Sequence, residues 1–96
     1  MNNQNTLSTQ NPQWRKDQQD YTRQVIFNVE VVPFTVQWGG LNKGCCLDHL
    51  DGRFGYITLE DAMDCNYRVF DYKTDTLLNS YQSLDELIED GWKVST

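Results

Sequence analysis

Hydrophobic and polar positions alternate along the chain from Gln24 onward, with the period of a half-buried β-strand. The apolar set first comprises Val25, Phe27, Val29 and Val31. It then changes parity and continues as Val32, Phe34, Val36 and Trp38. A shift of one residue moves the buried side chains to the other face of the sheet unless the strand contains a bulge. Pro33 lies at the shift, and its missing N–H is tolerated in a strand only at a bulge or at an edge. The pattern therefore predicts one long strand bent near Val32 and Pro33, or two strands that meet there.

Two hairpins are predicted after this strand, separated from it by a loop that contains Gly39, Gly40 and Gly44. Asp51-Gly52 is a strong two-residue turn signal between the segments 47–50 and 53–57. The segments 67–72 and 76–82 form the arms of the second hairpin, with its turn near Lys73 to Asp75.

Two similar segments, TLEDAMDCNYRV at 58–69 and SLDELIEDGWKV at 83–94, each predict a short helix that follows a hairpin. Thr58 and Ser83 are suitable hydroxyl N-caps, and the acids three residues later, Asp61 and Glu86, complete the pattern of a capping box. Apolar residues at i, i+3 and i+4 predict one buried stripe on each helix. These stripes consist of Leu59, Ala62 and Met63 and of Leu84, Leu87 and Ile88.

The likeness of the two segments continues beyond the helices into an aromatic residue, a basic residue and a valine, which the rules of helix formation do not require. A duplicated strand-strand-helix unit, at about 46–69 and 71–94, explains this likeness, and convergence on the same folding rules is the alternative. In both cases the expected fold class is α+β. We predict an antiparallel sheet of about five strands (a long bent N-terminal strand, two hairpins and a short C-terminal strand) with two short helices on one face.

The first 22 residues are rich in Asn and Gln and poor in aliphatic side chains, so they are expected to form a mobile tail before a single domain at 23–96. Asn11 and Pro12 are compatible with the start of a short helix that would place Trp14 and Tyr21 on one face. Trp14, beside Arg15, is expected either to fold back on the domain or to contact a partner. Trp38 and Trp92 continue apolar strand sets, so we interpret them as packing anchors.

Composition and charge exclude several classes of function. The chain has 96 residues and a net charge of −6, and residues 25–96 hold five basic against twelve acidic side chains. Such a surface repels phosphate groups, which disfavours binding to nucleic acid or to anionic membranes. The sequence contains neither a secretory signal nor an apolar run long enough to span a membrane, and its three cysteines are an odd number, so a reduced cytoplasmic protein is expected.

The segment DHLDGRFGYITLEDAM locally resembles the second half of an EF-hand calcium loop. The alignment places Leu50, Gly52 and Phe54 where oxygen ligands are required, so calcium binding is rejected. Gly55 is interpreted instead as a position of close backbone approach, and Thr58 as a helix cap.

Cys45, Cys46, His49 and Cys65 supply enough ligands for a tetrahedral zinc site, although their spacing is not that of common zinc motifs. The alternative is that the cysteines are small reduced core residues. Nucleophilic catalysis is not favoured, because Cys46 and His49 point to opposite faces of a strand and Cys65 lies at the negative end of its helix. The sequence therefore predicts neither an enzyme nor a cofactor, with zinc as the one candidate metal.

The favoured hypothesis is a small, non-enzymatic interaction or regulatory protein that uses a sheet edge, acidic helix faces and the N-terminal tail, and that binds a protein partner or a second copy of itself. The candidate partner-binding residues are Trp14, Arg15, Glu60, Asp64, Glu86, Glu89 and Asp90. One alternative is an acidic inhibitor that mimics nucleic acid, which requires the helix carboxylates to form one continuous surface. The other is a zinc-stabilised binding module.

Overall fold

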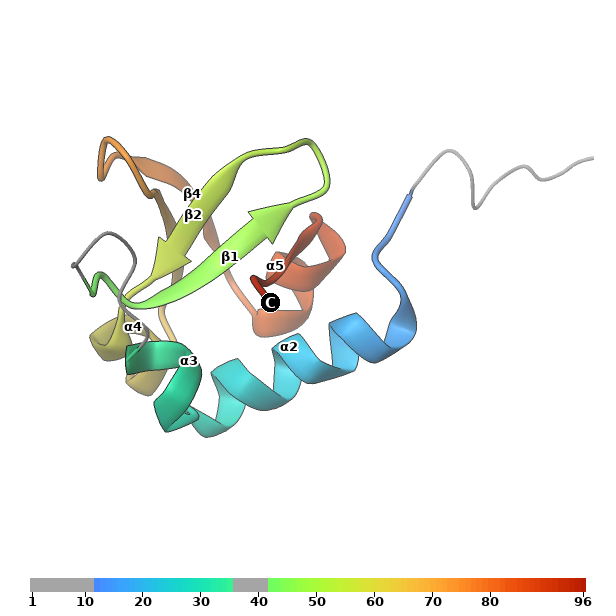
Figure 1. Cartoon of the computed structure of the whole chain (residues 1–96), viewed down its shortest axis with the longest axis horizontal. Coiled ribbons are helices and arrows are strands. Elements are labelled where there is room, and N and C mark those ends of the chain that lie inside the picture. The colour runs from blue at the N-terminus through green and yellow to red at the C-terminus, as the bar shows by residue number, and fades with distance from the viewer. Residues whose placement is uncertain (1–11, 36–41) are drawn as a thin grey trace, which may run out of the picture.

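The computed structural model describes residues 12–35 and 42–96 (Figure 1). Within these ranges the helices are α2 (Lys16–Asn28), α3 (Val31–Thr35), α4 (Leu59–Met63) and α5 (Leu84–Glu89). The strands are β1 (Cys45–His49), β2 (Phe54–Ile57), β3 (Tyr67–Asp71), β4 (Leu77–Tyr81) and β5 (Trp92–Val94). The strands form one antiparallel sheet, so the predicted α+β class is confirmed.

The order of strands in the sheet is β4-β3-β2-β1-β5. The two predicted hairpins, β1–β2 and β3–β4, are both present. The chain then leaves β4 at one edge, passes through α5, and adds β5 beside β1 at the other edge, where Leu47 pairs with Val94 and His49 with Trp92. The long connection through α5 thus brings the last strand next to the first.

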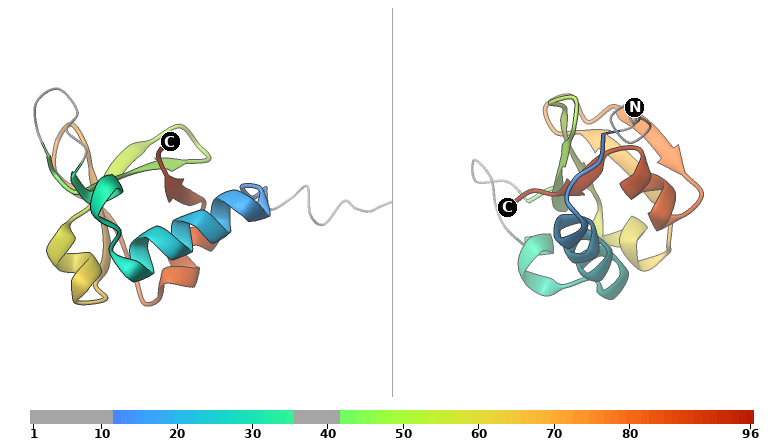
Figure 2. Two further views of the ribbon diagram at one scale, coloured as in Figure 1. Left: turned by 60° about the horizontal axis from the view of Figure 1, so that its bottom comes forward. Right: turned by 90° about the vertical axis from the view of Figure 1, so that its right-hand side faces the viewer.

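The helices pack on one face of this sheet, as predicted, and enclose the hydrophobic core. In Figure 2, α2 lies alongside α5 and passes over β5, while α3 and α4 occupy the other end of the molecule. The buried apolar side chains come from both layers and include Ile26, Leu47, Ile57, Val69, Leu87, Ile88 and Trp92. Trp92 is fully buried, so its interpretation as a packing anchor is confirmed; Trp38 lies outside the described residues.

The predicted N-terminal strand is wrong, because residues 16–28 and 31–35 are helical. The side chains that α2 buries are Thr22, Val25 and Ile26, which have helical spacing, whereas Phe27 is 72% exposed. The apparent alternation was compatible with a helix whose buried stripe is completed by Thr22, a polar residue. Pro33 falls within the first turn of α3, where no intrahelical bond needs its N–H. The expected second half of the strand, at 36–38, lies outside the described residues.

The predicted tail is too long at its C-terminal end. Helix α2 begins at Lys16, so residues 16–22 belong to the folded body. Ion pairs one turn apart support this polar helix, with Asp20 binding both Lys16 and Arg23. Residues 1–11, including the proposed cap Asn11, lie outside the described residues.

The two predicted hydroxyl caps are confirmed. Thr58 Oγ1 accepts a hydrogen bond of 3.0 Å from Asp61 N, and Ser83 Oγ accepts one of 3.1 Å from Glu86 N. In α5 the Glu86 carboxylate accepts the backbone N–H of Gln82, the residue before the cap, and not that of Ser83 as a capping box requires. In α4 the carboxylate of Asp61 binds Arg68. The reciprocal bond of the predicted capping box is therefore not formed in either helix.

The predicted apolar stripe is present on α5 and incomplete on α4. Leu84, Leu87 and Ile88 are all buried. On α4, Ala62 is buried, but Leu59 is 44% exposed and Met63 is 64% exposed. The two strand-strand-helix units have the same element order, but α4 leads into a neighbouring strand while α5 crosses to the far edge of the sheet. Duplication of the unit therefore stays a prediction.

Candidate functional site

The four candidate zinc ligands are not brought together. Cys45 and Cys46 are consecutive residues of β1 and point to opposite faces, and Cys65 lies on the exposed turn after α4. No three His, Cys, Asp or Glu side chains of residues 12–35 and 42–96 are grouped as metal ligands. Cys45 is 0% exposed and belongs to the hydrophobic core, and this burial raises the pKa of its thiol to about 12. The candidate zinc site, which the spacing of these residues did not favour, is therefore not formed.

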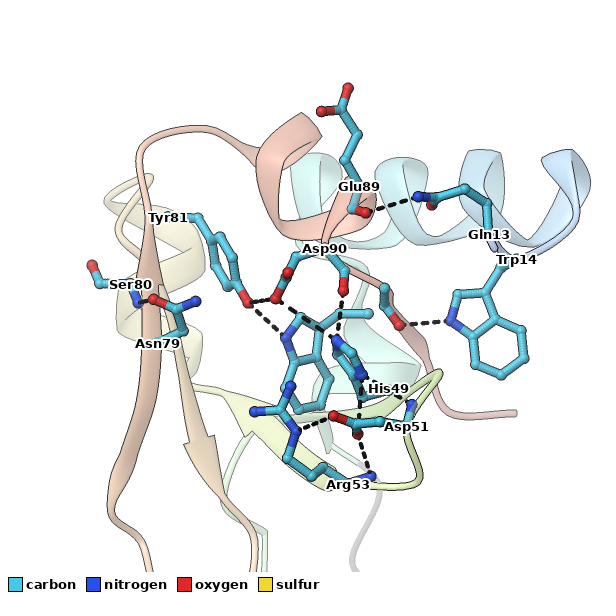
Figure 3. Close-up of polar contacts among 12 residues, drawn as sticks. Gln13, Trp14, His49, Asp51, Arg53, Asn79, Ser80, Tyr81, Glu89 and Asp90 are labelled. Atoms are coloured by element: carbon cyan, nitrogen blue, oxygen red, sulfur yellow. Dashed lines mark hydrogen bonds and ion pairs between the residues drawn. The ribbon is translucent and has the colours of Figure 1, made fainter. Parts of the chain in front are cut away.

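His49 joins the β1–β2 turn to the end of α5 (Figure 3). Its Nε2 lies 2.6 Å from the backbone oxygen of Asp90, and its Nδ1 accepts a 3.1 Å hydrogen bond from Asp51 N. Nδ1 also lies 3.0 Å from the Asp51 carboxylate. The ring also packs edge-on against Trp92, with 4.7 Å between centroids. Both ring nitrogens thus have structural partners.

The same network continues from Asp90 to β4 and β5 (Figure 3). Asp90 accepts a short hydrogen bond from the Tyr81 hydroxyl, and that hydroxyl accepts one of 2.9 Å from Trp92 Nε1. Burial and the Asp90 carboxylate raise the pKa of Tyr81 to about 12. Asp90, a candidate partner-binding residue, therefore has a structural function in holding Tyr81.

Trp14 folds back on the domain, which is one of its two predicted outcomes. Its Nε1 donates a 2.7 Å hydrogen bond to Gly91 O, and the neighbouring Gln13 Nε2 donates one of 2.9 Å to Glu89 O. The Lys93 ammonium lies 5.0 Å from the centre of the indole ring. Arg15 remains exposed and pairs with Asp17. We call residues 12–15 the N-terminal strap.

The helix carboxylates do not form one continuous acidic surface. Asp61 is 3% exposed and binds Arg68 through two hydrogen bonds, and Asp85 accepts hydrogen bonds from Arg23 of α2. The Glu86 carboxylate accepts the backbone N–H of Gln82. The remaining predicted contact residues, Glu60, Asp64 and Glu89, are exposed. The nucleic-acid mimic, which required all these acids on one surface, thus loses its main support.

Side chains bond several backbone groups at or next to the two edge strands, β4 and β5. At β4, the Ser80 N–H donates to the side chain of Asn79 at 2.8 Å, and the Gln82 N–H donates to Glu86. At β5, Val94 N–H donates to Thr22 Oγ1 at 2.9 Å, and Val94 O accepts from Lys93 Nζ at 3.2 Å. These four backbone groups are therefore already bonded and are less available to a further strand.

An exposed apolar surface lies where α2 ends and α3 begins, and sequence reasoning missed it. Phe27, Val31 and Val32 are 72%, 72% and 71% exposed. We call these three residues the apolar corner; α2 and α3 meet there in Figures 1 and 2. The exposure of Phe27 follows from the helical structure of 16–28, because burial of Val25 and Ile26 turns it outward. Val31 and Val32 belong to α3, whose buried residue is Phe34. A helical reading of this segment would have identified it.

Comparison with protein-family models, with curated proteins and with solved structures found no match to this chain. Among the described residues, no helix has the length and apolar character needed to cross a membrane.

Proposed function

We propose that this protein is a non-enzymatic, cytoplasmic interaction module that docks on a protein partner through the apolar corner. The observation that carries the proposal is the exposure of Phe27, Val31 and Val32, three large apolar side chains within six residues of chain. Isolated exposed apolar residues are common, but neighbouring ones mark sites of association.

The charge around the corner supports a contact of apolar character. Between residues 24 and 35 the only charged residue is Glu30, and its carboxylate accepts a 2.8 Å hydrogen bond from the Gln24 side chain. The whole chain has a net charge of −6, nearly all of it outside this segment, and such a charge favours solubility. A partner is therefore expected to present an apolar groove or face without a complementary charge cluster.

The surroundings of the candidate reactive groups agree with a binding function. A general base needs a free ring nitrogen, and both nitrogens of His49 are bonded to backbone groups. A nucleophilic thiol needs a lowered pKa, and that of Cys45 is raised.

The proposal is tested with a photo-crosslinking amino acid at position 32 in the native host, compared with the same amino acid at exposed position 73. A partner should be captured from position 32 alone, and Phe27→Ser in the same chain should reduce its yield. Leu77→Ser is the matched control, since Leu77 is exposed on β4. Equal capture from positions 32 and 73 would contradict the proposal. Light scattering of the purified protein at several concentrations shows whether the captured partner is a second copy.

A further inference from the structure

We propose that a pocket between α2 and β5 binds a small oxyanion, a carboxylate or a phosphate group, through Lys93 and Arg15. The pocket has a volume of about 260 Å³. Its polar lining includes Arg15, Asp17, Gln18, Tyr21, Lys93 and Thr96. It is separate from the apolar corner, and the proposal does not depend on the function assigned to that surface.

The main observation is the burial of Lys93, whose side chain is only 8% exposed. An ammonium group has three N–H donors. Among the described residues, its one hydrogen-bond acceptor is Val94 O at 3.2 Å. The Asp48 carboxylate forms an ion pair with Lys93 at 3.7 Å, beyond hydrogen-bond distance, and the Trp14 ring offers a weak cation–π contact at 5.0 Å. Lys93 lines the pocket and has more N–H donors than the one that it gives to Val94 O.

A buried charge is costly unless it is both paired and hydrogen-bonded. An oxyanion in the pocket would accept further Lys93 donors and add hydrogen bonds that the ion pair with Asp48 does not supply. Lysine binds phosphate and carboxylate as a point charge, so the site suits either group.

Arg15 supplies the second cation of the pocket. Its side chain is 75% exposed and pairs with Asp17, which is 72% exposed, so this ion pair is weak and can rearrange when a ligand binds. The side chains of Gln18 and Tyr21 add neutral hydrogen-bonding groups on the wall formed by α2. Asp17 is the group that opposes an anion, and its exposure allows it to turn to solvent.

The experiment is an NMR titration of the full ¹⁵N-labelled chain at constant ionic strength. The probes are inorganic phosphate and N-acetylglycine, and N-acetylglycinamide is the uncharged control. We expect saturable shifts of the amide signals of Gln18, Lys93 and Val94 with at least one anion and none with the amide. Saturation by phosphate alone or by N-acetylglycine alone identifies which group the site prefers.

Matched variants show whether the pocket is responsible. Lys93→Met keeps the length of the side chain, fits a buried position and should weaken binding about tenfold or more, because a charge-assisted hydrogen bond is lost. Arg15→Gln, at an exposed position, should weaken it several-fold, whereas Lys73→Met on the β3–β4 turn should leave it unchanged. Absence of saturation with both anions, or an equal loss in Lys73→Met, would overturn the proposal.

Discussion

Thr22 illustrates how a single polar side chain joins two parts of this fold. Its hydroxyl donates to Gln18 O at 2.8 Å within α2 and accepts the Val94 N–H at 2.9 Å. The residue is 1% exposed, so both bonds are protected from water. Hydrophobic patterning ignores such a residue, because threonine counts as polar. Buried hydroxyls of this kind therefore mark contacts that an apolar pattern cannot reveal.

The three cysteines should differ in reactivity. Cys65 is exposed, whereas Cys45 is buried and burial raises the pKa of its thiol to about 12. Because the thiolate is the reactive form, a maleimide or iodoacetamide at neutral pH should modify Cys65 rapidly and Cys45 only after unfolding. Mass spectrometry of peptides before and after addition of denaturant measures the order. Modification of Cys45 in the native protein at the rate of Cys65 would contradict its burial.

The raised pKa values of two tyrosines predict that the folded state loses stability at alkaline pH. Burial raises the pKa of both Tyr81 and Tyr56 from 10 to about 12, helped by hydrogen bonds to Asp90 and Asp75. A group whose pKa is higher in the folded state stabilises the fold fully below its unfolded pKa. This contribution is present below pH 10 and is lost as the pH rises to about 12.

Urea unfolding at pH values across this window, with tyrosinate absorbance as a second signal, measures the effect. Tyr81→Phe removes one of the titrating groups, so its free energy of unfolding should depend less on pH in the same range. An identical pH dependence in the variant would show that Tyr81 does not contribute.

At the scale of elements, local signals predicted the hairpins and helix caps correctly. A turn or a helix cap is determined by residues adjacent in the sequence, so the sequence alone is sufficient to place it. This holds for the turn at Asp51-Gly52 and for the caps Thr58 and Ser83. Helix α2 could not be placed in the same way. Its stripe includes Thr22, and its β-branched residues at 25 and 26 fit a strand equally well, so contact with α5 and β5 decides its structure.

Gly55 was correctly predicted as a position of close approach, and its substitution should be costly. A Cβ atom there would lie 2.7 Å from Phe70 O, 2.9 Å from Val69 Cγ1 and 3.3 Å from the Trp92 ring. Gly55→Ala should lower the free energy of unfolding by about 1–3 kcal/mol, because the crowded strand and indole must move. Urea unfolding checks this, with Leu77→Ala on the exposed side of β4 as the control. A Gly55→Ala variant as stable as the control would show that the strand has room for a side chain.

For the whole molecule, the sequence predicted the fold class better than the site. The spacing of the two hairpins and the capped helical segments after them are local properties of the chain, and they led to the α+β class. The pocket beside Lys93 arises only when α2 packs along β5, because its residues come from 15–21 and 93–96. The apolar corner was missed because the segment around it was predicted as a strand. Trp14 was recognised as unusual in a polar segment, but its acceptor, Gly91, lies 77 residues away.

The N-terminal strap is expected to stabilise the whole molecule, because it attaches one end of the chain to the last helix and strand. Trp14→Ala removes the hydrogen bond to Gly91 O and the indole that lies over Lys93. We expect a loss of about 2 kcal/mol in the free energy of unfolding, from one hydrogen bond and a half-buried aromatic ring.

The same substitution should also increase self-association at high concentration, since Lys93 then covers Val94 O at the β5 edge less securely. Urea unfolding and light scattering measure the two effects. Arg15→Ala is the matched control, because its side chain is exposed and its hydrogen bonds within 12–35 and 42–96 go to Asp17. If Trp14→Ala and Arg15→Ala gave the same stability and the same scattering, the strap would have no part in holding the two ends of the chain together.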